Sequence, residues 1–590
     1  MAERSPDTPP SSTFPQGRLD SWKEIAVYLH RDVKTVQRWE KREGMPVHRH
    51  QHDRIGSVYA FSSELDAWAQ NRSLQLEEEV QPSVEAPADA GSDRGQGTLS
   101  WVRRRIVLAG VVGLALLGIA YIFTRGRGNA TSPKIKSLAV LPLKNLSGDP
   151  AQEYFADGMT EAVIGRLSMI RGLRVISRTS SMRFKDTRMS TPEIAKSLGV
   201  DAIVEGSVMR EGGRVRVHAQ LIRAATDEHF WSETYDRDLG DALALESEVA
   251  QAIAQRVQVT FTGDERARLA ATRSVAPEVY ESYLKGAFGK NNSRTEIETS
   301  IGYFEEAIRK DPTFAPAYVG LAFAYDDLGT VLVGASPEEV RPKAISAARK
   351  ALELDPDLAD AHALLGDMQQ DQWHWAEAEA EFKRALDLKP NDAAAHLGLA
   401  NWLLCQGRTE EALVWSRRAR ELDPLGVTGL SNGWILFNAR RYDEAIGELR
   451  SVLAVHPDYA TAYWFLGYTL IAKGQSEEAI SVLEKTVSLM DRSPGSLEFL
   501  ATAYAHAGRR REALRLINEL KQRRKTSYVS ADALVDPYLA LGDYDEAFVW
   551  LERAYQEKSG GLQYLKVDPV FDPVRKDPRF ADLQHRVGLD

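Results

Sequence analysis

The spacing of apolar and polar residues changes several times along the chain and divides it into segments. Apolar positions at helical spacing come first; a polar stretch, an unbroken apolar run, short alternating apolar runs and a repeated helical pattern follow. These changes predict boundaries at 1–17, 18–72, 73–102, 103–124, 133–262 and 277–590. A chain of 590 residues is too long for one hydrophobic core, so we expect several domains.

Residues 18–72 begin with two predicted helices. The first starts at a capping box, Ser21 to Glu24, in which the serine caps the helix and the glutamate reaches back. The second is capped by Asp32, and its Val33 and Val36 point inward. The stretch 44–46, Gly-Met-Pro, ends this helix, and two short strands around a basic turn are expected after it.

The outer face of the second helix forms one polar stripe. Lys34, Gln37, Arg38 and Lys41 lie at positions i, i+3, i+4 and i+7, so they can present amide and cationic donors to base edges in a major groove. Seven basic and four acidic residues lie between positions 31 and 54, although the whole chain has a formal net charge of −10. Positive charge is therefore concentrated where contact with DNA phosphates is expected. The alternative is an ordinary solvated helix face.

The stretches SWKEIAVYL, DVKTVQRWEKREGMPVHRH and GSVYAFSSELDAW resemble the winged helix-turn-helix of MerR and excisionase type. The resemblance implies that the second helix and the wing read double-stranded DNA. Many members of this family bind as dimers, so a homodimer is an open alternative, although no heptad coiled coil is evident. Together with the charge pattern, the resemblance gives the predicted DNA-binding residues Lys34, Thr35, Gln37, Arg38, Lys41, Arg49 and Arg54.

Three histidines in the predicted wing, His48, His50 and His52, would share one face of a strand. A metal site is conceivable there, but no carboxylate or cysteine is placed to complete it. The expectation is therefore no metal and no cofactor.

The run from Ile106 to Phe123 is eighteen uncharged residues, which span about 27 Å as a helix, close to the hydrocarbon thickness of a bilayer. Residues 103–124 are therefore predicted to be a single transmembrane helix in a bacterial inner membrane. Residues 73–102 are expected to be a flexible linker, and 1–17 a disordered arm. Because Lys and Arg are balanced on the two sides, only Arg103 to Arg105 and the need to reach DNA place the amino terminus in the cytoplasm and the carboxyl-terminal region in the periplasm.

Residues 133–262 alternate short apolar runs with helical patterns, which is typical of an α/β domain. The apolar runs are 135–143, 173–177, 202–208 and 215–222, and Thr191-Pro192 is read as a helix start with Thr191 as the cap. The stretches SLAVLPLKNLSGDPAQEYFADGMTEAVIGRL and SLGVDAIVEGSVMREGGRVRVHAQLIRAATDEHFWSETYDRDL resemble the TolB N-terminal-like domain found beside tetratricopeptide arrays. The resemblance implies a sensory or assembly role and no reaction.

From residue 277 onward two series of small residues advance in register. Prolines at helix ends are each followed five residues later by a small residue: Ala317, Ala361, Ala395, Gly429 and Ala462. A second series advances by 33 or 34 residues: Ala344, Ala378, Ala412, Ala445, Ala479, Ala513 and Ala547. Two registered series at one period predict a helical repeat whose units stack into a solenoid.

The period, these small residues and a glycine between paired helices (Gly329, Gly407, Gly474, Gly508, Gly542) resemble tetratricopeptide repeats. About eight helix pairs fit, and the ending after residue 566 is expected to cap the solenoid. The resemblance implies a concave groove for a protein or peptide partner, with the candidate residues Asp367, Asn401, Asn438, Trp464, Tyr468 and His506. Cys405 also falls there, and we read it as an inert small side chain rather than a redox sensor.

The predicted fold class is therefore multidomain: a small winged helix-turn-helix, a single transmembrane helix, an α/β TolB-like domain and an all-α tetratricopeptide solenoid. This order resembles ToxR- and CadC-type regulators and implies a membrane-anchored DNA-binding transcriptional regulator that contacts DNA, the lipid bilayer and a protein partner. The alternative is a membrane-tethered tetratricopeptide scaffold without direct DNA binding. An enzyme is not expected, because no catalytic constellation stands out and no segment is left over for a catalytic domain.

Overall fold

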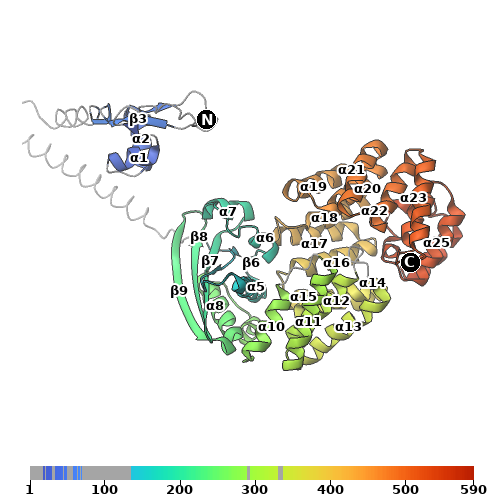
Figure 1. Cartoon of the computed structure of the whole chain (residues 1–590), viewed down its shortest axis with the longest axis horizontal. Helices are drawn as coiled ribbons and strands as arrows, with labels where there is room; N and C mark the ends of the chain where they lie inside the picture. Colours follow the sequence, from blue (N-terminus) through green and yellow to red (C-terminus); the bar gives the residue numbers. More distant parts are fainter. Residues whose placement is uncertain are drawn as a thin grey trace, which may run out of the picture. The chain divides into compact units, whose positions relative to one another are not determined.

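The computed structural model describes residues 18–19, 21–29, 33–43, 45–49, 58–62, 64–66, 68, 134–288, 293–329 and 336–590. The chain divides into two compact units, 1–128 and 129–590, which are treated separately below (Figure 1). The predicted arm 1–17, linker 73–102 and membrane span 103–124 lie outside the described residues.

The amino-terminal unit consists of two helices and a small sheet, which enclose one hydrophobic core. Its helices are α1 (Trp22–Tyr28) and α2 (Val33–Glu43), and its strands are β1 (Arg18–Leu19), β2 (His48–Arg49) and β3 (Val58–Phe61). The strands form an antiparallel sheet in the order β1-β3-β2. Ser21 caps α1, its hydroxyl accepting from the Glu24 backbone N–H at 3.2 Å, as the capping box predicts.

The hydrophobic core of this unit follows the predicted helical spacing. Ile25 and Ala26 of α1 and Val36 of α2 are buried against Val58 and Ala60 of β3. Leu65, which follows β3, is buried in the same core.

No helix among the described residues is long and apolar enough to cross a membrane. The longest of them, α13 (Pro337–Leu354), has 18 residues and carries charged side chains along its length. The described part of the chain therefore does not support the transmembrane part of the predicted fold class or the predicted single-pass placement in a bacterial inner membrane. The described chain supports a mostly helical solenoid of tetratricopeptide type.

Residues 134–270 form a mixed sheet covered by helices on both faces. The strands are β4 (Ser137–Val140), β5 (Lys144–Asn145), β6 (Arg174–Val175), β7 (Ala202–Glu211), β8 (Arg214–Arg223) and β9 (Glu228–Asp238). Their order is β6-β4-β7-β8-β9, and β5 also pairs with β7. The pairs among β4, β5, β6 and β7 are parallel, whereas β7, β8 and β9 are antiparallel.

The helices around this sheet are α5 (Glu153–Ser168), α6 (Arg178–Met182), α7 (Thr191–Leu198), α8 (Ala242–Arg256) and α9 (Gly263–Ala270). Helices α5 and α8 share one core with Leu138 and Val140, while α7 packs with Ala139 and Ile203 on the opposite face (Figure 1). The cap of α7 differs from the prediction: Ser190 rather than Thr191 is the capping residue, and its N–H and hydroxyl donate to Glu193.

The described residues after the α/β domain include eight helix pairs. They are α10 (Pro277–Ala287) and α11 (Arg294–Lys310), α12 (Ala315–Leu328) and α13, α14 (Ala359–Asp371) and α15 (Trp375–Leu388), α16 (Ala393–Cys405) and α17 (Thr409–Leu422), α18 (Gly429–Asn438) and α19 (Tyr442–Val455), α20 (Ala460–Ala472) and α21 (Ser476–Leu489), α22 (Pro494–His506) and α23 (Arg510–Arg523), and α24 (Val535–Ala540) and α25 (Tyr544–Gln556). Figure 1 shows the pairs stacked in sequence order.

Both series of small residues lie at contacts between helices. Every alanine of the second series, from Ala344 to Ala547, is fully buried, and Ala317 and Ala361 of the first are equally inaccessible. Close approach also requires glycine at particular positions: a Cβ on Gly398 would come within 2.3 Å of the buried Phe382 ring. Four of the five predicted turn glycines, Gly407, Gly474, Gly508 and Gly542, have positive φ, a conformation that favours glycine. The fifth, Gly329, has negative φ.

The chain end contains the short helices η4 (Gly560–Tyr564) and η5 (Pro569–Phe571), then α26 (Pro578–Val587). Helix α26 packs on α25, as a cap would. The preceding residues, however, turn back along the array: η4 contacts α14 and α16, and Arg440, after α18, donates to the Val567 carbonyl at 3.2 Å. We call residues 558–572 the closing segment. Its apolar side chains share a core with the repeats.

Candidate functional site

The predicted DNA-reading face lies on α2, opposite the core. Lys34 and Arg38 are exposed and stand one helical turn apart, while Thr35 and Gln37 are half-buried beside them. On the other side, Val36 is fully buried, so this helix turns a cationic face outward. The Lys41 and Arg49 side chains and the whole of Arg54 lie outside the described residues. DNA binding by these residues stays a prediction.

The wing histidines do not come together in the described part. His48 forms an ion pair with Glu64, with 2.7 Å between Nε2 and the carboxylate, and its ring stacks on Tyr59. His50 and His52 lie outside the described residues. The contacts of His48 hold β2 against β3 and the segment after it.

A cavity of about 790 Å³ lies inside the helical array of the second unit. The described residues that line it extend from Gly329, just after α12, to Leu551 in α25, and include part of the closing segment. The cavity is therefore built by several repeats, by η3 (Asp532–Leu534) and by a segment that follows the last repeat.

Aromatic rings form much of the cavity wall. Trp434 stacks on Phe465 with 5.2 Å between centroids, and Tyr564 of the closing segment meets Trp434 edge-on at 5.2 Å. Trp464 lies 4.7 Å from Phe499. These contacts leave a wall of π-faces that can hold an apolar or cationic group.

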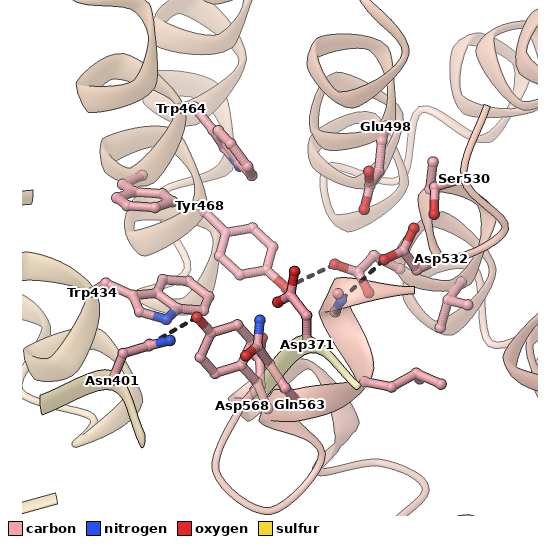
Figure 2. A pocket seen from close by; sticks show the side chains of 18 of the residues that line it. Asp371, Asn401, Trp434, Trp464, Tyr468, Glu498, Ser530, Asp532, Gln563 and Asp568 are labelled. Atoms are coloured by element: carbon pink, nitrogen blue, oxygen red, sulfur yellow. Dashed lines mark hydrogen bonds between the residues drawn. The ribbon is translucent and has the colours of Figure 1, made fainter. Parts of the chain in front are cut away.

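Carboxylates line the same space. The lining residues include six carboxylates, Asp367, Asp371, Glu498, Asp532, Asp536 and Asp568, and one guanidinium, Arg341. Figure 2 shows Glu498 and Asp532 on one side of the cavity, with the rings of Trp434 and Trp464 on the other. Arg341 pairs with Asp371 at 3.1 Å.

Burial inside this acidic surface raises the pKa of several carboxyls. Desolvation raises the pKa of Asp536 to about 7 even though the Tyr468 hydroxyl donates to it at 2.7 Å. Desolvation and the neighbouring Asp536 raise the pKa of Asp568 to about 8. Desolvation, followed by repulsion from nearby carboxylates, also raises the pKa of Glu498 and of Asp367 well above the ordinary range.

The predicted groove residues fall into three groups. Asp367, Asn401, Trp464 and Tyr468 line the cavity. Asn438 is 2% exposed and donates to the Trp434 carbonyl at 2.9 Å, and His506 is exposed and outside the cavity lining.

Cys405 is buried beside the Gln563 amide, and burial raises the pKa of its thiol. That environment favours the inert thiol, as expected. The role of all these residues in partner binding stays a prediction.

Sequence reasoning missed two acidic lining residues, Asp536 in α24 and Asp568 in the closing segment. Asp536 and Asp568 each stand in a Val-Asp-Pro triplet, 535–537 and 567–569, and both line the cavity. This repeated triplet is the signal that could have paired them. Tyr564 was missed as well; its hydroxyl donates to Asn401 at 2.8 Å.

Comparison with known proteins identifies two kinds of module. The tetratricopeptide repeat family matches residues 369–426 and 430–496, and a second description of that repeat matches 494–519, which confirms the predicted repeats. Residues 134–255 match the second domain of HilA/YgeH-like transcriptional regulators. These matches do not include the expected TolB-like or MerR-type family.

Individual relatives match only parts of the chain. "Putative adenylate cyclase 3" of Rhizobium meliloti (strain 1021) is 35% identical over 236 residues, 40% of this chain and 40% of that protein. "TPR repeat-containing protein YpiA" of Bacillus subtilis (strain 168) is 22% identical over 267 residues, 45% of this chain and 61% of that protein. The solved structure of YrrB, a TPR protein, is 24% identical with a TM-score of 0.23, covering 32% of this chain and 91% of that one. The chain thus contains tetratricopeptide repeats and a HilA/YgeH-like regulator domain, and it spans less than two thirds of these two curated relatives.

Proposed function

We propose that the protein is a DNA-binding transcriptional regulator whose repeat region binds a partner or ligand that alters its action. The observation that carries the proposal is the exposed Lys34–Arg38 pair on α2, in a chain that also contains a HilA/YgeH-like regulator domain. A helix with a cationic outer face and a buried inner face suits insertion into a major groove. The net charge of −10 makes contact through the rest of the chain unfavourable.

The test is duplex binding by the full chain, measured by fluorescence anisotropy at fixed salt after selection of a preferred sequence. Arg38→Ala is expected to weaken specific binding by about tenfold or more, because one good side-chain contact to DNA contributes about 1–3 kcal/mol. Arg188→Ala, an exposed arginine of the second unit, is the matched control and should bind like the unaltered chain. Equal affinities for selected and random duplexes would defeat the proposal.

A second candidate function is a protein-binding scaffold without DNA contact, favoured by the tetratricopeptide match itself. It predicts that Arg38→Ala leaves cellular activity intact while changes in the repeat array abolish it. The match to the adenylate cyclase spans 40% of that relative, which is too little to carry its activity over to this chain.

A further inference from the structure

The closing segment turns the groove of the array into a bounded cavity. Tyr564 donates to Asn401 at 2.8 Å, Gln563 accepts from Gln370 at 2.7 Å, and Lys558 donates to the Gln372 carbonyl at 3.1 Å. An extended peptide along this part of the groove would have to displace these contacts. The remaining volume of about 790 Å³ suits a small molecule or a single long side chain.

The lining residues include six carboxylates but only one cationic side chain, Arg341, which pairs with Asp371. Asp536 is 9% and Asp568 is 6% exposed, and neither has an ion-pair partner within the described ranges. Glu498 is half-buried and Asp367 is exposed, and neither carboxylate has a hydrogen bond or an ion pair to any residue that the structure describes. Since buried carboxylates are normally paired, this surface is complementary to a cation that the chain itself does not supply.

The wall favours an organic cation over a metal ion. Rings of Trp434, Trp464 and Phe499 face the same space, and ammonium groups bind aromatic faces while their methylene groups pack on them. No group of three or more His, Cys, Asp or Glu among the described residues is arranged to hold a metal. The carboxylates are instead spread around the cavity, from α14 to the closing segment, which suits charges spaced along a flexible chain.

We propose that this cavity binds an organic cation with ammonium groups spaced along an aliphatic chain. The ammonium groups lie against Glu498, Asp536 and Asp367, and the methylene groups pack on Trp434 and Trp464. A free polyamine and the lysine side chains of a protein share this chemistry. That this cation regulates the protein rests on the proposed function. Binding of the cation itself does not depend on DNA.

Binding is expected to release protons. Desolvation raises the pKa of Asp536 to about 7 and that of Asp568 to about 8, so both are partly protonated near neutral pH, and a bound cation favours their ionised forms. Affinity should therefore rise between pH 6 and pH 8.5, where aliphatic amines stay charged. The other charged and titratable groups around them are Arg341, Asp367, Asp371, Arg440, Tyr468, Glu498, Tyr528, Asp532, Tyr564 and Arg575.

The experiment is isothermal titration of the full chain, without DNA, with spermidine, with its fully acetylated neutral derivative, and with an acetyl-trilysine amide peptide. Spermidine or the peptide should bind, with affinity that increases with pH, and the neutral derivative should not. Tighter binding of spermidine would identify a free amine as the ligand, and tighter binding of the peptide a lysine-bearing protein. Glu498→Gln should weaken binding about tenfold, because it removes one partner of a charge pair.

Glu377→Gln, an exposed glutamate on α15 outside the cavity, is the matched control and should leave the affinity unchanged. Circular dichroism and the melting temperature check that Glu498→Gln is folded, and the pH dependence of the unaltered chain tests the site without any substitution. The inference fails if neither cation binds, if the neutral derivative binds equally well, or if affinity does not change with pH. Failure of DNA binding would leave these titrations unaffected, so the two proposals fail separately.

Discussion

Two regions of the second unit, the junction and the cavity, contain buried polar side chains, and the two regions differ in how these side chains are paired. At the junction between the α/β domain and the array, Asn391 donates through Nδ2 to the carbonyls of Ile170 at 2.9 Å and Leu173 at 2.8 Å. Asp423 accepts from the Ser180 hydroxyl at 2.6 Å in the same junction. In the cavity, by contrast, the buried carboxylates of Asp536 and Asp568 each accept a hydrogen bond but have no ion-pair partner among the described residues. Polar groups whose hydrogen bonds cross the junction hold two parts of the fold together, whereas carboxylates without an ion-pair partner can bind a cation from outside the chain.

The largest loss of stability is expected from a substitution at the junction. Asn391→Leu removes the donor and leaves buried carbonyls of the α/β domain without a partner, so the free energy of unfolding should fall by about 3–5 kcal/mol. Urea denaturation followed by circular dichroism measures the loss. Asn401→Leu, which removes one partly accessible bond in the cavity, is the comparison and should cost about 1 kcal/mol. Equal losses at the two sites would remove the distinction between them.

A smaller effect is expected from pH. The folded-state pKa values of Asp536, about 7, and Asp568, about 8, lie above their unfolded values, so the folded protein binds more protons. Their stabilising contribution is fully present below the unfolded pKa and is lost as pH rises through 7 and 8. Glu246 of the α/β domain, whose pKa desolvation raises to about 7, adds a contribution of the same sign.

The free energy of unfolding should therefore fall by about 2 kcal/mol between pH 7 and pH 9. Urea denaturation at fixed ionic strength measures it. Asp568→Asn should flatten the slope between pH 7 and pH 8. A stability that rises over this range would show that the cavity carboxylates are ionised at neutral pH.

The smallest expected effect is a gain in stability when one cavity carboxylate is neutralised, opposite in sign to the loss at the junction. Asp536→Asn keeps an oxygen that can accept from Tyr468 but removes the uncompensated charge, so at pH 8.5 it should raise the free energy of unfolding by about 1 kcal/mol. Asp458→Asn, at an exposed position, is the control and should change it by less than about 0.5 kcal/mol. Thermal melting at pH 8.5 and pH 5.5 compares the two variants. Destabilisation by Asp536→Asn at pH 8.5 would show that its charge is already compensated.

The repeat pattern was predictable because each unit contacts only its neighbours. Small residues recur wherever two helices cross, and the fully buried alanines from Ala344 to Ala547 follow that period. The capping box at Ser21 was equally readable, since its bonds stay within one helical turn. By contrast, β9 carries only two buried side chains, Trp231 and Tyr235, so its polar pattern gave no clear strand signal; its pairing with β8 decides its conformation.

By itself the sequence determined the periodic solenoid, the Ser21 cap of α1 and a helix with one cationic face, because each depends on residues a few positions apart. Only the tertiary structure decided the cavity. Its walls combine α14, α22 and the closing segment, and the Gln370–Gln563 bond spans 193 positions along the chain. The spacing of residues within one repeat does not predict a contact between residues so far apart in the chain. It depends on how far the stacked repeats curve and on where the closing segment returns to them.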